Sequence, residues 1–195
     1  MERRISAPSM IKEKNMVGIF FAQGFEEVEA LTVVDLLRRA GIDNKMISVT
    51  GESEVTGSHD ITVKMDERIE NISFDELDAI VLPGGNPGFP NLEKCELLKE
   101  KTIEFSNNEE KLVAAICGAP SVLGHWGVLN GIKACVYPGM DAELIGAKVS
   151  HKSVVTDGHI ITSRGMGTAI DFGLAIVEYY KGSKVSKELS EKIVY

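Results

Sequence analysis

Continuous apolar runs at residues 16–22, 77–82 and 111–116 are the clearest feature of the hydrophobic pattern. Short apolar runs of this kind, each followed by polar or turn-forming residues, are typical of strands that are buried on both faces of a sheet. Weaker patterns predict strands at 43–49 and 132–136, a small hairpin within 54–64, and a β-rich stretch at 147–163 with a turn at Asp157 and Gly158.

Residues 26–40 carry apolar side chains at helical spacing, with acidic residues in the first turn and Arg38 and Arg39 in the last. This order of charges complements the helix dipole, and Gly41 then ends the helix. Further helices are predicted at residues 91–107, 119–126, 167–180 and 183–191.

Strands that alternate with helices predict βαβ units, and therefore an α/β fold whose largely parallel sheet has helices on both faces. Ligands bind such sheets outside the carboxyl ends of the strands. The loops with unusual chemistry directly follow the three apolar strands at 16–22, 77–82 and 111–116. We therefore expect the functional site at this edge of the sheet.

Composition and charge narrow the function classes. The chain of 195 residues is 44% hydrophobic and 26% charged, which excludes a disordered chain, a collagen-like fibre and a disulfide-stapled miniprotein. The net charge of −8 disfavours nucleic acids and anionic membrane surfaces as partners. We expect one domain over residues 16–195, preceded by a disordered polar extension at residues 1–15 that lacks the apolar segment of a secretory signal.

The three cysteines, Cys95, Cys117 and Cys135, do not have the spacing of a disulfide framework or a zinc site. Free thiols indicate a reducing compartment, so we expect a cytoplasmic protein. Cys117 stands out because it lies in AAICGAP, where a buried strand meets the start of a helix. The helix dipole there favours a thiolate, although a buried structural cysteine fits the position equally well.

An acidic cluster of Glu26, Glu27 and Glu29 opens the first helix. Complementarity with the helix dipole accounts for Glu26 and Glu27. Glu29 lies one helical turn from Glu26, and a carboxyl group that faces the sheet edge there could hydrogen-bond Cys117 or act as an acid–base group. Only the fold can bring Glu29 and Cys117 together.

The segment LPGGNPGF, residues 82–89, follows a buried strand and exposes backbone N–H groups in a tight turn, which makes it a candidate oxyanion site. It matches neither of the common phosphate-binding glycine motifs, so no nucleotide site is predicted. Histidine spacing predicts no metal site, and His125 is interpreted as structural. Cys95 and Cys135 are interpreted as bystanders. Met140 and Met166 are interpreted as core or pocket-lining residues.

Together these motifs resemble the DJ-1/ThiJ/PfpI family. AQGFEEVEA, which contains Glu29, is similar to the start of the family's first helix, VLPGG to its glycine-pair loop, and AAICGAP to its cysteine elbow. TSRGMGTAIDFGLAIVE is similar to the C-terminal helix region of the DJ-1-like branch. The resemblance covers residues 16–182.

The resemblance implies a flavodoxin-like three-layer sandwich with a mostly parallel central sheet, similar to the class I glutamine amidotransferases, and a homodimer without a cofactor. It implies that Cys117 is the nucleophile and that Glu29 is its protonated partner. It also implies that the backbone N–H groups of Gly85 and Gly118 bind an oxyanion.

Several activities are credited to this family: glyoxalase III conversion of methylglyoxal to lactate, deglycation of protein or nucleotide groups, redox sensing and chaperone action. The resemblance favours a cofactor-independent cysteine enzyme acting on small α-oxoaldehydes or their glycation adducts. The alternative is a redox-sensing, stress-response or chaperone protein that uses oxidation of Cys117. A cysteine peptidase and an old thiamine (thiazole) biosynthesis label are weaker alternatives.

Two positions depart from the family pattern. The peptidase branch has a histidine directly after the cysteine, where this chain has Gly118, and this disfavours peptidase activity. DJ-1-type glyoxalases often place a histidine before a proline further along, where this chain has Tyr137. Tyr137 is kept as a pocket residue with a hydroxyl group, but tyrosine is a poor base at neutral pH. Whether another loop supplies the base is left open by the sequence.

Overall fold

A computed structural model describes residues 15–195, so the extension predicted at residues 1–15 lies, apart from its last residue, outside the described residues. The strands of the central sheet are β1 (Met16–Phe21), β2 (Asp43–Ser48), β5 (Glu67–Arg68), β6 (Ala79–Leu82), β7 (Leu112–Ile116), β10 (Val154–Asp157) and β11 (Ile160–Ser163). Their order is β10-β11-β7-β6-β1-β2-β5. All neighbouring pairs are parallel except β10 and β11, which form a hairpin at one edge.

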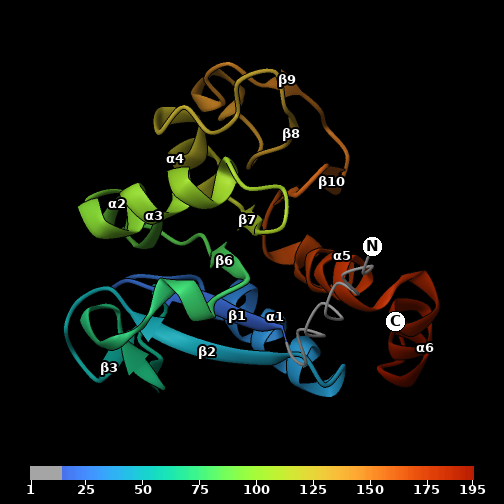
Figure 1. The fold of residues 1–195 in the computed structure, drawn as a ribbon, viewed down its shortest axis with the longest axis horizontal. Helices are drawn as coiled ribbons and strands as arrows, with labels where there is room; N and C mark the ends of the chain where they lie inside the picture. Colours follow the sequence, from blue (N-terminus) through green and yellow to red (C-terminus); the bar gives the residue numbers. More distant parts are fainter. Residues whose placement is uncertain (1–14) are drawn as a thin grey trace, which may run out of the picture.

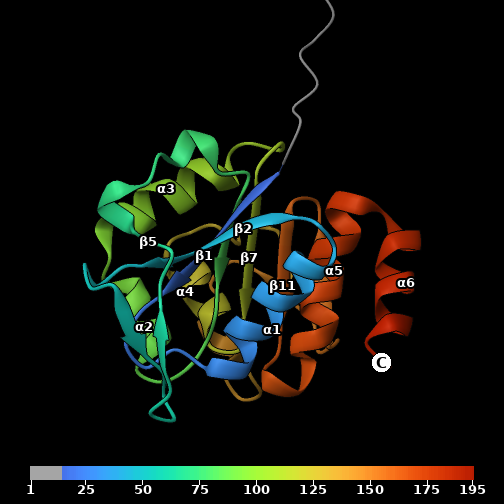
Figure 2. The ribbon, with the colours of Figure 1, turned by 90° about the horizontal axis from the view of Figure 1, so that it is seen from below.

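Two groups of helices cover the two faces of this sheet, as Figure 2 shows. The first group contains α1 (Glu27–Arg39), α5 (Ala169–Lys181) and α6 (Ser183–Lys192). The second contains α2 (Gly88–Glu93), α3 (Glu96–Ser106) and α4 (Ala119–His125). Short 3₁₀ turns occupy residues 69–71, 74–76, 141–143 and 166–168. The pattern predicted an α/β fold with helices on both faces of the sheet, and the arrangement is the three-layer, flavodoxin-like sandwich that the family resemblance implies.

Two apolar cores fill the spaces between the sheet and its helices, because successive side chains of a strand point to opposite faces. In β1, Val17, Ile19 and Phe21 pack on the face that α1, α5 and α6 cover. The intervening Phe20 packs on the face of α3 and α4. This explains why the strand is apolar at nearly every position.

Two small sheets lie outside the central one (Figure 1). The predicted hairpin within 54–64 is confirmed as antiparallel β3 (Glu54–Thr56) and β4 (Thr62–Lys64). The strand predicted at 132–136 is shorter than expected, since only β8 (Lys133–Ala134) pairs, with β9 (Lys148–Val149). Neither strand belongs to the central sheet, and β5 is too short for a periodic signal.

The helix predicted over residues 91–107 is in fact two helices, α2 and α3. Cys95 interrupts them with an extended backbone (φ −83°, ψ 97°) as the N-terminal cap residue of α3. Over residues 15–195, no helix combines the length and the apolar character needed to cross a membrane.

The strand order places the functional loops. Strands β7, β6 and β1 are neighbours and parallel, so their carboxyl ends meet at one edge of the sheet. The loops after them carry Cys117, the glycine pair of residues 84–85, and the start of α1 with Glu29. Three motifs that are far apart in the sequence therefore converge.

Candidate active site

Cys117 occupies a sharp turn between β7 and α4 with φ +66°, a conformation that is uncommon for a residue other than glycine. Two backbone hydrogen bonds hold this turn. The N–H of Cys117 donates to the carbonyl of Ser163 at 3.0 Å, and its own carbonyl accepts from the N–H of Tyr137 at 2.8 Å. Surrounding structure thus stabilises a backbone conformation that costs about 1–3 kcal/mol by itself, as at many functional sites.

Glu29 lies beneath Cys117 on the first turn of α1 and is only 1% exposed. Its carboxyl group is hydrogen-bonded to the Cys117 side chain, and its Oε2 accepts from the N–H of Gly84 at 2.9 Å. Its buried Oε1 has no hydrogen-bond partner. The backbone N–H of Glu29 donates to Oε2 of Glu26, the helix N-cap, at 2.7 Å, which anchors the turn that presents the carboxyl group.

Burial shifts the titration of both members of this pair. It raises the pKa of Glu29 to about 7, aided by the charge of Glu26 and opposed by hydrogen bonds from Cys117 and Gly84. It raises the pKa of Cys117 to about 12, aided by the charge of Glu29. The backbone N–H groups of Gly118 and Gly85 act in the opposite direction on the thiol. Two groups in contact titrate as one unit, so the pair holds one proton over much of this range.

The helix dipole was expected to favour a Cys117 thiolate. The surroundings of Cys117 favour the protonated thiol instead. Burial and the adjacent carboxylate outweigh the backbone N–H groups of Gly118 and Gly85, and α4 has only seven residues. A nucleophilic Cys117 would need Glu29 to accept its proton as the sulfur attacks.

Glycines around Cys117 leave room for the contact between Cys117 and Glu29. A Cβ added to Gly84 would lie 2.5 Å from the Cβ of Cys117 and 2.6 Å from Oε2 of Glu29. Gly85 has φ +97°, and the ring of Phe89 occupies the space where a Gly118 side chain would lie. The structure thus brings together the predicted residues Cys117, Glu29, Gly85 and Gly118, and it adds Gly84.

A pocket of about 580 Å³ opens above Cys117. Its walls are formed by Glu26, Ser58, His59, Gly85, Asn86, Phe89, Cys117, Gly118, Tyr137 and Met140. Tyr137, predicted as a pocket residue, lies on the wall with half of its surface exposed. Met140 also lies there, whereas Met166 is exposed and does not line the pocket.

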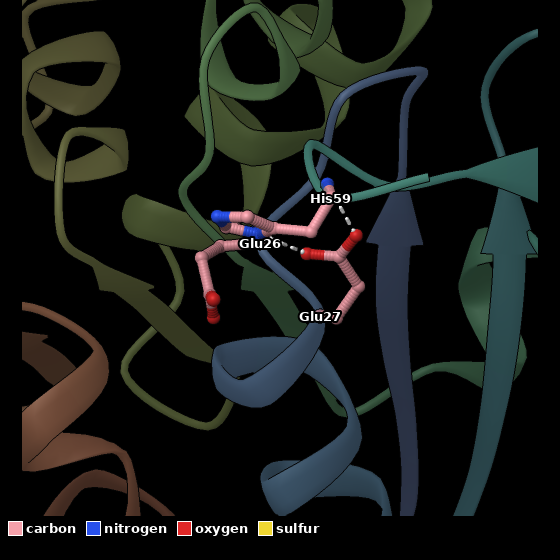
Figure 3. Close-up of side chains that lie close together, drawn as sticks. All are labelled: Glu26, Glu27 and His59. Carbon is pink, nitrogen blue, oxygen red and sulfur yellow. Dashed lines mark hydrogen bonds and ion pairs between the residues drawn. The ribbon is translucent and has the colours of Figure 1, made fainter. Parts of the chain in front are cut away.

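His59, next to Ser58 on the wall, is a residue that the sequence analysis did not connect with the site (Figure 3). It comes from the turn between β3 and β4 and lies over the start of α1. Its Nδ1 is 2.8 Å from Oε2 of Glu27, and its backbone N–H donates to Oε1 of Glu27 at 2.7 Å. No local pattern links residues so far apart, so this contact could not be found from spacing.

Glu26, Glu27 and His59 also place one potential ligand atom each within 4.8 Å of one another, a grouping that the histidine spacing did not indicate. Both oxygens of Glu27 and Nδ1 of His59 already take part in hydrogen bonds within this cluster. These hydrogen bonds explain why the side chains of Glu27 and His59 lie together: they form a carboxylate–imidazole pair.

The other cysteines and His125 lie outside the pocket walls, in agreement with their interpretation as bystanders and a structural residue. His125 bridges Glu93 and Glu143, with Nδ1 and Nε2 at 2.7 and 2.9 Å from their carboxylate oxygens. The backbone N–H of Cys135 donates to the hydroxyl of Thr162 at 2.9 Å in the interior.

Comparisons with known proteins agree with this geometry. The model described as the DJ-1/PfpI family matches residues 15–179. Protein dj-1beta of Drosophila melanogaster is 35% identical over 178 residues, which are 90% of this chain and 95% of that protein. A protein of Pyrococcus abyssi named deglycase is 35% identical over 154 residues, which are 76% of this chain and 89% of its own length. DJ-1 homolog B of Arabidopsis thaliana is 37% identical over 95% of this chain, which spans only 43% of that longer protein.

Solved structures show the same fold. Oxidized Toxoplasma gondii DJ-1 superimposes with a TM-score of 0.89 at 31% identity, covering 93% of this chain and 98% of that one. Drosophila DJ-1beta superimposes with a TM-score of 0.87 at 33% identity and the same coverage.

Proposed function

The chain belongs to the DJ-1/PfpI family, and we propose that it is a cofactor-independent cysteine enzyme that acts on methylglyoxal-type α-oxoaldehydes or on their glycation adducts. The relative named deglycase supports a DJ-1-type enzymatic function in general terms. The observation that carries the specific proposal is the contact between the buried Glu29 and the half-buried Cys117, which lines an open pocket.

The first step of the proposed reaction uses this pair directly. The Cys117 sulfur attacks the aldehyde carbon, a C–S bond forms, and the thiol proton passes to the Glu29 carboxylate. The electron pair of the carbonyl moves to its oxygen, which the backbone N–H groups of Gly85 and Gly118 stabilise. Such preorganised donors contribute about 3–4 kcal/mol each in comparable sites. Glu29 then returns the proton to that oxygen and leaves a hemithioacetal.

A glycation adduct reaches the same hemithioacetal when the Cys117 sulfur displaces the amine. The sulfur replaces the amine at the carbinolamine carbon, and the proton held by Glu29 leaves with the amine nitrogen. The pocket supports small substrates, because the Phe89 ring lies against Gly118 and restricts the space beside the sulfur. The Glu26 carboxylate on the wall disfavours negatively charged ones.

Turnover of methylglyoxal tests the proposal. Cys117→Ala should abolish it, and Glu29→Gln should lower it by at least about 100-fold, the usual contribution of an acid–base group. Cys95→Ala is the matched control, because Cys95 does not line the pocket and should leave the rate unchanged. Wild-type turnover no faster than that of Cys117→Ala would refute the proposal.

A second candidate function, redox sensing, is supported by the same surroundings of the sulfur. A Cys117 sulfinate formed by peroxide would accept hydrogen bonds from the N–H groups of Gly85 and Gly118 and from a protonated Glu29. Mass spectrometry after mild peroxide treatment should then find two added oxygens on Cys117 alone. Equal oxidation of Cys95 and Cys135 would count against this function.

The proposal also includes a homodimer and a cytoplasmic location, as the family resemblance implies. Light scattering of the purified full chain, at concentrations above and below the micromolar range, tests the assembly. A mass equal to one chain at every concentration would exclude a stable dimer.

A further inference from the structure

The proposed chemistry needs a second proton-transfer group, and the site as described so far does not provide one. Glu29 takes the thiol proton and returns it to the substrate oxygen, but it is buried and does not line the pocket into which the second carbon of the substrate extends. The phenol of Tyr137 also reaches the wall, where its hydroxyl group can donate or accept a hydrogen bond. The carboxylate of Glu26 on the wall is held as the N-cap of α1 by the N–H of Glu29. We therefore consider His59, because histidine is the side chain that commonly exchanges a proton near neutral pH.

The contact between His59 and Glu27 orients the imidazole ring. The Glu27 carboxylate lies 2.8 Å from Nδ1, so the proton of a neutral ring is placed on Nδ1 and Nε2 is left as the acceptor. The side chain of Glu27 is only 4% exposed, and it fills the space beside Gly57 where any Cβ would lie. A carboxylate held this firmly fixes the ring, as in catalytic Asp–His pairs.

Nearby charges adjust the titration of this pair. The hydrogen bond and the charge of Glu27 raise the pKa of His59, and Glu26 and Asp60 add smaller contributions of the same sign. Burial raises the pKa of Glu27, but the hydrogen bonds from the ring and backbone of His59 outweigh it, and the net pKa lies below the ordinary value. Glu27 is therefore the member of the pair that stays ionised, and the pKa of His59 lies above its ordinary value.

We propose that His59, oriented by Glu27, is the acid–base residue that moves a proton between the two carbons of the substrate once it is bound to Cys117. This inference rests on the proposed function and supplies the group that its second half requires. It assigns to the turn between β3 and β4 a catalytic role that neither the family motifs nor the residue spacing indicated.

The steps balance without an outside oxidant. Nε2 of His59 takes the proton from the carbon bonded to sulfur, and the electron pair forms a C=C bond to the neighbouring ketone carbon. The carbonyl electrons move to the ketone oxygen, which takes the proton from the hydroxyl group of the first carbon, so the intermediate is an enediolate. The ring then returns the proton to that second carbon. The first carbon is thereby oxidised to a thioester and the second is reduced to an alcohol. Water cleaves the thioester to lactate, and the Cys117 thiol is restored.

The test compares His59→Asn with wild type, because the asparagine amide can still donate to Glu27 from about the position of Nδ1 but cannot accept a proton in the way Nε2 does. His151→Asn is the matched control, since His151 is exposed and does not line the pocket. The rate of methylglyoxal turnover should fall by about 100-fold or more in His59→Asn and stay unchanged in His151→Asn. The rate of Cys117 alkylation by iodoacetamide should change less than about twofold, because the nucleophile is intact.

The pH profile gives a readout that a merely structural role would not move. Neutral His59 is required, so kcat/KM should fall at acid pH through the titration of both His59 and Glu29. In Glu27→Gln the carboxylate that raises the pKa of His59 is gone, so the His59 component should move to lower pH. In His59→Asn only the Glu29 component should remain.

Each outcome decides between the two proposals. If His59→Asn turns over methylglyoxal as fast as wild type while Cys117→Ala does not, the role of His59 is overturned and the proposed function stands. If wild type is no faster than Cys117→Ala, the proposed function fails, and the role of His59 fails with it. A fall in turnover together with an equal fall in Cys117 alkylation would show that His59 only shapes the pocket, and would also overturn the inference.

Discussion

The carboxyl group of Glu29 is hydrogen-bonded to the thiol of Cys117, although the two residues come from different halves of the chain. Burial raises the pKa of both groups, to about 7 for Glu29 and about 12 for Cys117. Between these values the pair holds one proton that either partner can carry. The nucleophilicity of Cys117 therefore depends on whether Glu29 accepts its proton.

Replacement of Glu29 should separate thiol reactivity from turnover. In Glu29→Gln the carboxylate charge no longer opposes the thiolate, so the pH midpoint for alkylation of Cys117 by iodoacetamide should move down. Turnover should fall in the same protein, because no group accepts the thiol proton. A wild-type midpoint well below the free-cysteine value of about 8.5 would contradict this account of the pair.

The same carboxyl group should make stability depend on pH. The pKa of Glu29 is raised from 4.5 to about 7 in the folded chain, so the folded state binds this proton more tightly than the unfolded state. The contribution of this tighter proton binding to the free energy of unfolding is fully present below pH 4.5 and is lost as the pH rises through about 7. The cost at pH 8 is about 3 kcal/mol. Urea denaturation should find Glu29→Gln more stable than wild type at pH 8, with a smaller difference at pH 5.

Gly84 should not tolerate even a methyl group. In Gly84→Ala the new Cβ would lie 2.5 Å from the Cβ of Cys117, so the pair of Cys117 and Glu29 must move apart. We expect a loss of about 1–3 kcal/mol in the free energy of unfolding, together with a loss of turnover. Gly167→Ala is the control, because a Cβ there meets nothing within 4 Å. Equal stability of the two variants would show that the site adapts.

His125 should contribute stability at acid and neutral pH that disappears in alkali. Burial lowers its pKa, but the hydrogen bonds to Glu143 and Glu93 outweigh this effect and the net pKa is raised. The contribution is present below the ordinary value of 6.5 and is lost as the pH rises through the higher folded value. In His125→Asn, thermal denaturation should show a loss of about 1 kcal/mol or less at pH 6 and none at pH 9. A loss that does not vary with pH would assign His125 a packing role instead.

Local sequence patterns were sufficient to predict much of the fold and the candidate residues at the carboxyl ends of the central strands. The apolar runs that became β1, β6 and β7 are visible because strands buried on both faces need apolar side chains at nearly every position. The rule that ligands bind at the carboxyl ends of parallel strands then located Cys117, Gly85 and the start of α1 at one edge. The predictions failed where the local signals are weak. In residues 91–107, for example, an extended Cys95 separates two helices.

By itself the sequence determined the α/β class, the alternation of most strands and helices along the chain, and the choice of Cys117 and Glu29 as candidate residues. Only the tertiary structure decided that Glu27 is paired with His59 and that the histidine reaches the pocket wall. It also decided that burial and the neighbouring Glu29 raise the pKa of Cys117. The physical reason is the range of the interactions. Periodicity and capping act within a few residues, whereas burial and the docking of a hairpin onto α1 depend on segments that only the folded chain brings together.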